Sequence, residues 1–596
     1  MDRKHRLNII LTFVIGLTLL YLGLVVSFFA LNLSFTPGQI ALQLMPPGPP
    51  DPLMLQQIMQ QYGLNDPLFF RFLRYLGDFL VSNWGISSSI VIGMPVSDLL
   101  MRSVPHMIEL LIFPLIIGII LGYVIGRVSN RTKRNWLKNG IQSLSAVGIA
   151  VPIFFFGMFL QFTLAYLNPL FPAIGYKSVI HPSPPLITGF MTIDAILSGN
   201  LPLALDILYH YALPTIILLV AITALMTRAY SSNRAKDAYK KKTILSHTAK
   251  TSMVFGAIFT YLFLIDVTFN FSGFGSMFMT ALTQMDYFLL RGLLFVFIML
   301  FAGTLIISNF IFSIHGLIKD KNKLPLKEVA EPIEREPRIS TWVDLKTYLN
   351  KIVRSPLIYI GLVAVLFPIF VAIFPGLISG YSFEEVFGIY SGSWSPPFLG
   401  TPLGAHPLGQ AKFGRDVLAQ VAYGTRDSMI FGAGAVFIGL IGGLIFGLLA
   451  SKFNRKVHTI TMSVSLIFYV LPGILLILLA TMIFGNLFGL LMFTTGLLLI
   501  PSFTRIIANT EFRIVPIGKK ILSYLPLFAG FAILLYVSLG FLGFNDPLTV
   551  NLGGLINEGR SHLYDAPWAS LWPGLITFLI VVSLFILHEG LVKNSR

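Results

Sequence analysis

The chain alternates between long apolar runs and short polar segments along its whole length. Each run has about 20 residues or more, the length a helix needs to cross the roughly 30 Å hydrocarbon core of a bilayer. The runs lie near 7–33, 107–126, 141–168, 208–227, 253–270, 292–315, 356–379, 428–451, 458–481, 485–504, 523–544 and 571–592. They predict an all-α polytopic membrane protein with twelve transmembrane helices.

The first run is interpreted as a retained span and not as a cleaved leader. It follows a basic start, as a signal peptide does, but the run at 7–33 is too long for a signal core. It also lacks a small-residue cleavage site. We therefore count it as the first helix.

The charges of the polar segments test this count. Lys and Arg concentrate in the loops that stay on the cytoplasmic side of a membrane. With the N-terminus inside, the inner segments hold 33 basic residues and the outer segments hold nine, which together account for all 42. Omitting one span would exchange the sides of every later loop. We expect a multi-pass protein of the cell membrane with both termini in the cytoplasm.

A charged segment divides the spans into two sets of six. Residues 319–355 carry three prolines among many charges and are interpreted as a cytoplasmic linker. The predicted halves are 1–318 and 356–596, with large outer loops at 34–106 and 380–427. Because both halves start inside, they are parallel repeats and not inverted ones.

Similar short motifs recur in the two halves. Each half carries a Thr-Arg pair at the inner end of its fourth span, Thr227-Arg228 and Thr504-Arg505, at an offset of 277 residues. A basic loop, a fifth span and a turn rich in Gly and aromatic residues follow. The turn glycines Gly273 and Gly543 are 270 residues apart. An ancient duplication fits this spacing.

Composition supports a membrane protein. The chain is 55% hydrophobic and 11% charged, with a mean hydropathy of +0.79, whereas a soluble domain has about 25% charged residues. The net charge of +16 would raise the question of nucleic acid in a soluble protein, but cytoplasmic loops account for it here. Cysteine is absent, which excludes disulfides, thiolate metal sites and thiol nucleophiles.

Enzyme motifs are missing as well. The sequence contains no G-x-x-x-x-G-K-[ST] phosphate loop, no H-E-x-x-H and no G-x-S-x-G. No His or carboxylate cluster is evident either. We expect no catalytic, cofactor or metal site in this chain.

Asp266 stands out because a charge at membrane depth is costly and is often functional. The alternative is that it lies close enough to the outer surface to be solvated or paired. Glu109, His210 and the His588-Glu589 pair fall at predicted helix ends, where solvation would explain them. The candidates for the pathway or its gate are Asp266, Gly273, Gly275 and Gly543.

The first outer loop contains an amphipathic stretch at 65–76. Its apolar positions 69, 72, 73 and 76 follow helical spacing, and Pro67 suits a first turn. We expect a helix at the membrane surface or under a docked partner. In the second outer loop, Arg415 and Asp416 either fix the start of the next helix or contact a partner.

An ordered series of motifs in the first half resembles the first membrane subunit of oligopeptide and dipeptide ABC transporters. It comprises the stretch 62–87 with its Trp-Gly-Ile-Ser end, Gly-Met-Pro-Val at 93–96, Gly-Ile-Ala-Val-Pro at 148–152, and Asp266 followed by Gly-Phe-Gly at 273–275.

The second half resembles the partner permease of the same transporters. The motifs are His-Pro-Leu-Gly at 406–409, Gly-Arg-Asp-Val-Leu at 414–418, Tyr-Gly-Thr-Arg at 423–426, Phe-Leu-Gly at 541–543, Glu-Gly-Arg at 558–560 and Ala-Pro-Trp at 566–568. Together the resemblance covers most of 1–315 and 356–592. It implies a type I importer fold in which two normally separate permeases are fused.

By this resemblance, the chain is the permease of an ATP-driven importer for di- and oligopeptides that works by alternating access. Two cytoplasmic ABC ATPase subunits would use ATP and magnesium, and an extracellular binding protein would deliver the peptide. The residues expected to face that binding protein are Arg71, Arg74, Arg415 and Asp416.

The cytoplasmic loops after the fourth spans would dock the ATPases, although plain topology signals are the alternative. Both loops look shortened and lack the Glu-Ala-Ala core of the family, and the family Glu of span five is Asp266 in one half and Tyr536 in the other. The expected docking residues are Ala235, Lys236, Asp237, Ala238, Lys242, Glu511 and Arg513.

Other functions remain open at this point. Relatives of the family also import sugars or nickel. A secondary carrier is disfavoured because it would need further ionisable pairs within the membrane. A membrane anchor without transport activity is kept open by the shortened docking loops.

Overall fold

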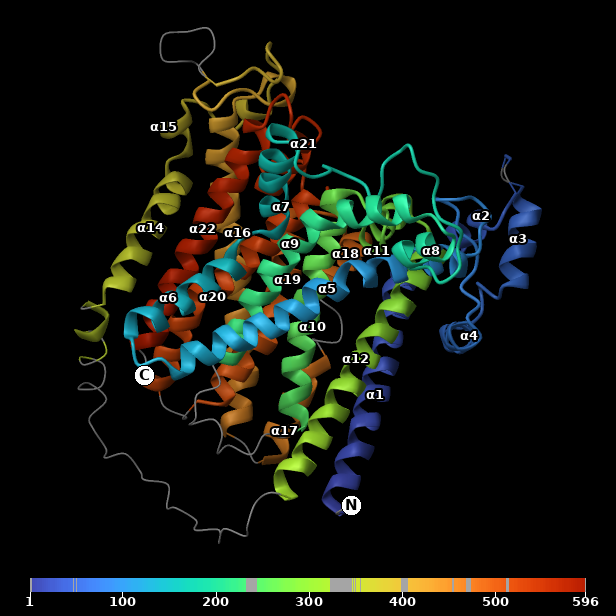
Figure 1. Ribbon diagram of the computed structural model, residues 1–596, viewed down its shortest axis with the longest axis horizontal. Coiled ribbons are helices and arrows are strands. Elements are labelled where there is room, and N and C mark those ends of the chain that lie inside the picture. Colours follow the sequence, from blue (N-terminus) through green and yellow to red (C-terminus); the bar gives the residue numbers. More distant parts are fainter. Residues whose placement is uncertain are drawn as a thin grey trace.

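The structure is a computed structural model that describes residues 3–594 except 47, 50, 232–243, 322–345, 347, 349, 354, 398–405, 453–454, 468–472 and 511–513. Within these residues the regular elements are helices, accompanied by two isolated β-bridges. The prediction of an all-α polytopic protein is confirmed (Figure 1).

Ten of the described helices are long and apolar enough to cross a membrane, or eleven if one bent pair counts as a span. The first-half helices are α1 (Arg3–Ser34), α5 (Val96–Arg131), the bent pair α6 (Asn135–Ala150) and α7 (Ile153–Gln161), α9 (Leu201–Ser231), α10 (Ile244–Phe269) and α12 (Tyr287–Lys321). The later ones are α14 (Pro356–Ile373), α16 (Val417–Lys452), α19 (Phe488–Ala508), α20 (Ile514–Phe541) and α22 (Trp568–Asn594).

The count of twelve stays a prediction. The ninth predicted run, 458–481, coincides with two shorter helices, α17 (Arg455–Ile467) and α18 (Gly473–Phe484). Residues 468–472 between them lie outside the described part of the chain.

The span predicted at 141–168 is broken in its middle. α6 and α7 meet at 86°, with Val151 in an extended conformation at φ −66° and ψ 123°. Pro152 explains the break, because a proline lacks the backbone N–H of a helix and disfavours helical geometry in the residue before it. On both sides of the bend the chain contacts α22 of the second half.

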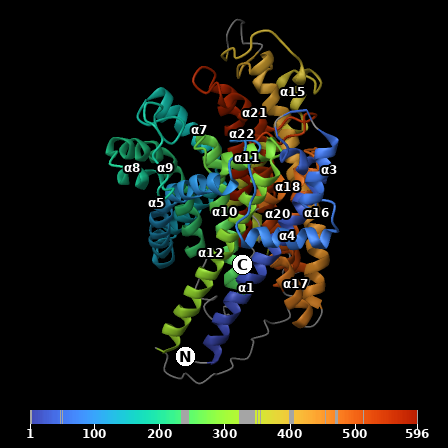
Figure 2. The same cartoon turned by 90° about the vertical axis from the view of Figure 1, so that its right-hand side faces the viewer.

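The same helix pairs pack together in each half. The first helix lies along the last, α1 with α12 and α14 with α22 (Figure 1, Figure 2). The second long helix crosses the fourth, α5 with α9 and α16 with α19.

Glycines bring the second pair into close contact in both halves. On α5 and α16, a Cβ added at Gly122 would lie 2.4 Å from Met226 Cβ, and one at Gly443 would lie 2.2 Å from Phe503 Cβ. Small residues four apart let helix backbones approach closely in membranes. The full stripes are Gly118, Gly122 and Gly126 on α5, and Gly439, Gly443 and Gly447 on α16.

The two stripes share one register. Each glycine of α16 lies 321 residues after its counterpart on α5, and the facing positions on α9 and α19 differ by 277. This second offset equals that of the two Thr-Arg pairs.

The loops that lead into α5 and α16 share the same hydrogen-bonding pattern. Val96 N donates to Gly85 O at 2.9 Å, and Val417 N donates to Gly409 O at 3.0 Å. One isolated antiparallel β-bridge closes each loop, Ile86 with Pro95 and Gln410 with Asp416. These repeats support two related halves. The boundaries at 318 and 356 stay predictions, and residues 322–345 of the predicted linker lie outside the described residues.

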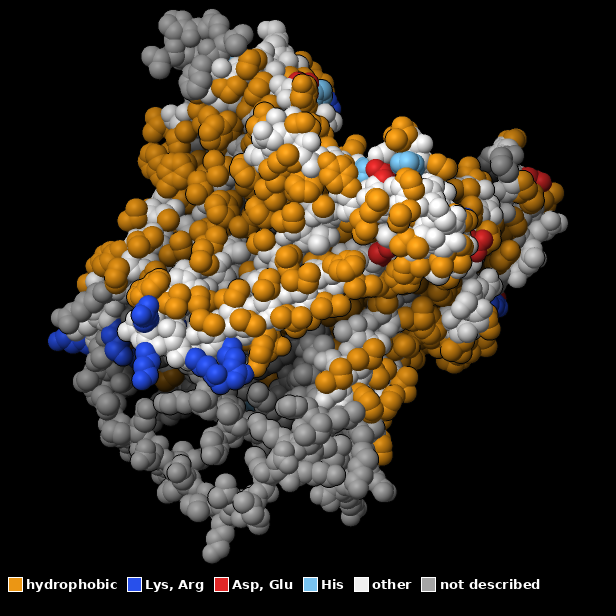
Figure 3. Space-filling view, viewed as in Figure 1, with side chains coloured by type: hydrophobic (Ala, Val, Ile, Leu, Met, Phe, Trp, Pro, Cys, Tyr) orange, Lys and Arg blue, Asp and Glu red, His pale blue; other side chains and the backbone are white. Residues whose placement is uncertain are grey.

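The ends of the helices agree with a common inner face. The start of α1, the end of α12 and the end of α22 all lie in the lower part of Figure 1. Figure 3 shows Lys and Arg side chains gathered over the turn between α5 and α6, where Arg127, Arg131, Lys133 and Arg134 are exposed. That this face is cytoplasmic stays a prediction.

The segments between the long helices contain short ones: α2 (Pro37–Gln43), α3 (Pro52–Gln61), α4 (Leu68–Leu80), α8 (Met191–Leu197), α11 (Phe274–Thr283), α15 (Pro375–Ser379) and α21 (Leu552–Arg560). α4 confirms the amphipathic helix predicted near 65–76, with Pro67 at its N-cap and not in its first turn. Buried Arg291 anchors this region, because it donates to Asp78 Oδ2 at 2.7 Å and to Asn83 O at 3.0 Å.

Candidate functional site

The main junction between the two halves is formed by α6, α7, α9 and α10 on one side and by α20, α21 and α22 on the other, and α1 separately contacts α18. Toward the outer face, the rings of Phe154 and Phe541 stack with centroids 4.6 Å apart. Phe155 packs so tightly on Gly574 that an added Cβ would lie 2.0 Å from the ring. The junction is therefore closed there by aromatic side chains from both halves.

A polar contact crosses the junction beside these rings. Arg560, the last residue of α21, donates from Nη1 to the carbonyl of Val267 on α10 at 3.2 Å. Its guanidinium carbon lies 5.5 Å from the centre of the Phe541 ring. Burial lowers the pKa of Arg560, because low-dielectric surroundings disfavour the charged form.

An ion pair joins the halves toward the inner face. Arg228 Nη2 contacts Glu589 Oε1, so the first Thr-Arg pair is connected to the last helix of the chain. The next side chain, His588, is 3% exposed and its Nδ1 lies 2.6 Å from Ser523 O. The inner contact is thus an ion pair, whereas the outer contact combines stacked rings with the Arg560 hydrogen bond.

Solvation at helix ends was the wrong explanation for Glu109, His210 and His588, because all three side chains are buried. Glu109 accepts from Thr192 N at 3.1 Å and from the Tyr211 hydroxyl at 3.3 Å. Glu109 is covered by the start of α8, and His588 is buried against Ser523 and Tyr524 of α20.

Three of the predicted pathway residues form one helix cap. Asp266 is 2% exposed and accepts from Gly273 N at 3.0 Å and from Ser276 N at 2.8 Å. A Cβ at Gly275 would lie 2.7 Å from Phe263 O. The carboxylate thereby satisfies the first N–H groups of α11 and holds this short helix against α10. Whether these residues gate a pathway stays a prediction.

The second half builds the same cap from different residues. Asn551 Oδ1 accepts from Gly553 N at 2.8 Å and from Gly554 N at 3.2 Å, and the Asn551 side chain lies over Gly540. A Cβ at Gly553 would lie 1.7 Å from Val537 O, as one at Gly275 would approach Phe263 O. The counterpart of Asp266 in the helix is thus Gly540.

Two expected correspondences are therefore corrected. Tyr536 lies about one turn before the level of Asp266, and its hydroxyl is 3.3 Å from Thr549 Oγ1. Gly543 has φ +91° inside a longer turn, whereas Gly273 is the N-cap residue of α11. Sequence reasoning missed Asn551, although an Asn directly before a helical segment is a common N-cap signal.

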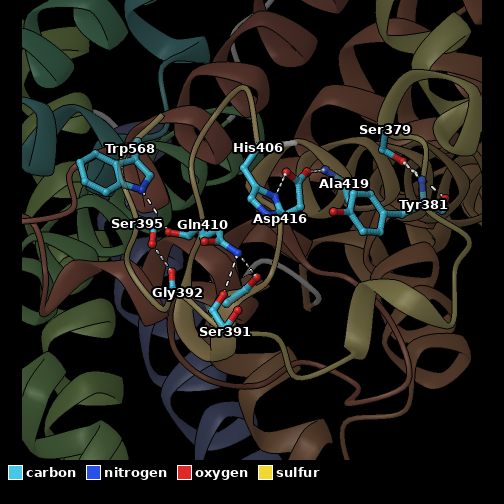
Figure 4. A network of polar contacts seen from close by, with 11 residues as sticks. Ser379, Tyr381, Ser391, Gly392, Ser395, His406, Gln410, Asp416, Ala419 and Trp568 are labelled. Atoms are coloured by element: carbon cyan, nitrogen blue, oxygen red, sulfur yellow. Dashed lines mark hydrogen bonds and ion pairs between the residues drawn. The ribbon is translucent and has the colours of Figure 1, made fainter. Parts of the chain in front are cut away.

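Side chains of the loop before α16 form a hydrogen-bonded network with the start of α16 and with α22 (Figure 4). His406 Nδ1 lies 2.9 Å from Asp416 Oδ2, and Ala419 N donates to Asp416 Oδ1 at 2.7 Å. Burial raises the pKa of Asp416, and the contacts with Ala419 and His406 oppose this rise. Trp568 Nε1 donates to Gln410 O at 3.1 Å, which ties the loop to α22.

The four residues expected to face a binding protein have different surroundings. Asp416 is buried as the cap of α16. Arg415 donates to Phe387 O at 3.1 Å and to Gly388 O at 3.2 Å, so it holds the loop together. Arg74 pairs with Asp66 and donates to Gly63 O at 2.9 Å, and Arg71 is partly exposed. Their contact with a partner stays a prediction.

The seven expected ATPase-docking residues all lie outside the described part of the chain: Ala235, Lys236, Asp237, Ala238, Lys242, Glu511 and Arg513. What is described is the base of the first loop, where Arg228 makes the inner ion pair.

Sequence comparisons identify relatives of this chain, although no model of a known protein family matches it. It is 28% identical over 216 residues to the glutathione transport system permease protein of Pectobacterium atrosepticum, which covers 32% of this chain and 72% of the relative. It is 26% identical over 287 residues to the dipeptide transport system permease protein of Alkalihalophilus pseudofirmus, covering 44% and 91%. The chain is homologous to ABC transport permeases.

The lengths of these matches are informative. An oligopeptide transport system permease protein of Bacillus subtilis is 25% identical over 272 residues, which is 80% of that permease but 40% of this chain. Most of each permease therefore aligns with less than half of this chain, as expected for a fused permease. Such permeases are components of a transport pathway and not enzymes.

Proposed function

We propose that this chain is the complete membrane-spanning pathway of an ATP-driven ABC importer for di- and oligopeptides. The observation that carries this proposal is the glycine-packed helix pair that occurs once in each half. Less than half of the chain aligns with most of a single permease relative, so the chain has room for two permeases. In this proposal the two halves stand in for two separate permease subunits.

In this proposal the junction contains the two closures that alternating access requires. The Phe154–Phe541 stack would act as the outer closure and the Arg228–Glu589 pair as the inner closure. A transport cycle would separate these contacts in turn. A partner can drive the cycle only if it binds the two states with different affinity.

The partners follow from the same proposal. Two cytoplasmic ABC ATPase subunits would bind ATP with magnesium, and an extracellular binding protein would deliver the peptide. A movement of the first docking loop would reach the junction directly, because Arg228 at its base is bonded to Glu589 in α22 of the other half.

Co-purification tests this assembly. An affinity-tagged full chain is expected to purify with two ATPase subunits per chain. The complex should hydrolyse ATP faster when peptide and binding protein are added. Purification of a folded chain without any ATPase subunit contradicts the proposal and would favour a membrane anchor.

A further inference from the structure

Arg560 lies at the point where a substrate would pass the outer closure. It belongs to α21 of the second half, bonds to Val267 of the first half at 3.2 Å, and contacts the Phe541 ring of the closing stack. Any separation of the halves on the outer side breaks this hydrogen bond. Arg560 then faces the opening between them.

The charge of Arg560 is poorly compensated. Among the residues that the structure describes, none provides a carboxylate within ion-pair distance of it. Glu558 on the same short helix points elsewhere, with its Oε1 3.8 Å from Lys412 Nζ. A guanidinium that has one carbonyl partner and further donors at the surface can gain a charge-assisted pair when a carboxylate reaches it.

A role as a helix cap accounts for only part of this arrangement. Arg560 ends α21, and Val267 O is among the last four carbonyls of α10, so the cation interacts favourably with both helix ends. A cap of this kind uses one of the five guanidinium donors. Within the described part of the chain the other donors have no further acceptor, and none of them is sealed from the surface.

We propose that Arg560 binds a free carboxylate of the substrate, such as the C-terminal carboxylate of a peptide, as the substrate passes the outer closure. This inference rests on the proposed import function. The guanidinium fork matches two carboxylate oxygens at once, which a carbonyl cannot offer. The carboxylate would replace the Val267 carbonyl and so favour the open outer side.

Competitive uptake of trialanine and trialanine amide tests the proposal in the reconstituted complex of full chain, ATPases and binding protein. The binding protein is the same throughout, so a change in the acid-to-amide uptake ratio reports on the permease. We expect R560Q to lower this ratio about tenfold while amide uptake changes less than twofold, and R560K to retain part of the preference. R102Q replaces an exposed outer arginine and should leave the ratio unchanged.

The other outcomes are decisive as well. If R560Q lowers the uptake of acid and amide by the same factor, Arg560 only ties the halves together and the inference is wrong, while the import function stands. If R560K does not differ from R560Q, a cation is not required and the inference is also wrong. If the wild-type complex takes up neither compound, the proposed function fails, and this inference fails with it.

Discussion

At the scale of single residues, buried carboxylates on the outer side serve mainly to cap turns and helices. Asp266, Asp194 and Asp416 each accept backbone N–H groups within a few residues of a turn. The sequence marks Asp266 as a costly charge but cannot reveal the cap, because the donors come together only when α11 folds back on α10. A variant of such a residue that loses function may only have lost stability, so a functional role requires a measurement of activity in a folded variant.

Asp194 allows a test with a defined pH dependence. Burial alone would raise its pKa, but hydrogen bonds from Thr188, Ile187 and Gly189 outweigh burial and lower the pKa of the carboxyl group. The stabilisation is therefore fully present above the unfolded-state pKa of about 3.9, and it is lost as pH falls through the lower folded-state pKa.

We expect Asp194→Asn to lower the free energy of unfolding by about 1–3 kcal/mol at pH 7, because backbone donors lose an acceptor. The difference from wild type should narrow below about pH 4. Thermal unfolding of the purified protein between pH 7 and pH 3 measures it. Asp98→Asn, at an exposed position, is the control. A difference that stays constant down to pH 3 contradicts this account.

At the scale of elements, apolar runs predict where helices lie but not how they bend or pair. Pro114 and Pro214 lie inside continuous helices, whereas Pro152 ends one, so the proline alone does not predict the break. The glycines four apart on α5 and α16 are visible in the sequence. Their partners on α9 and α19 are not, because helix pairing depends on the packing of the whole bundle.

The glycine stripes predict a position-specific effect of one methyl group. Gly122→Ala and Gly443→Ala should each cost about 1–3 kcal/mol, because the new Cβ overlaps a neighbouring side chain and forces the helices apart. Gly140→Ala is the matched control, since nothing lies within 4 Å of a Cβ there. The measurement is the thermal unfolding midpoint of each of the three variants. Equal midpoints in the stripe variants and the control would show that the stripes do not hold the helix pairs together.

At the scale of the whole molecule, the junction joins residues that are hundreds of positions apart. Phe154 meets Phe541 and Arg228 meets Glu589, and nothing in the local sequence around any of them indicates the contact. The resemblance to two permeases predicts a junction between halves. Its residues become known only from the packing of α7 and α9 against α20 and α22.

Crosslinking tests whether the outer closure must open. The chain has no cysteine, so Phe154→Cys with Phe541→Cys introduces the only two thiols. A short, reducible bifunctional thiol reagent should stop peptide uptake, and reduction should restore it. Each single-cysteine variant with the same reagent is the control. Unchanged uptake by the crosslinked protein would place the pathway elsewhere.

The most direct test of the central claim is peptide uptake by liposomes in which this chain is the sole membrane-embedded protein. With ATPase subunits inside and binding protein outside, we expect peptide to accumulate when ATP is supplied inside. Catalytically inactive ATPases should abolish the uptake. Uptake that needs a second, separate permease, or that proceeds on a proton gradient without ATP, contradicts the claim that this chain is a complete ABC importer pathway.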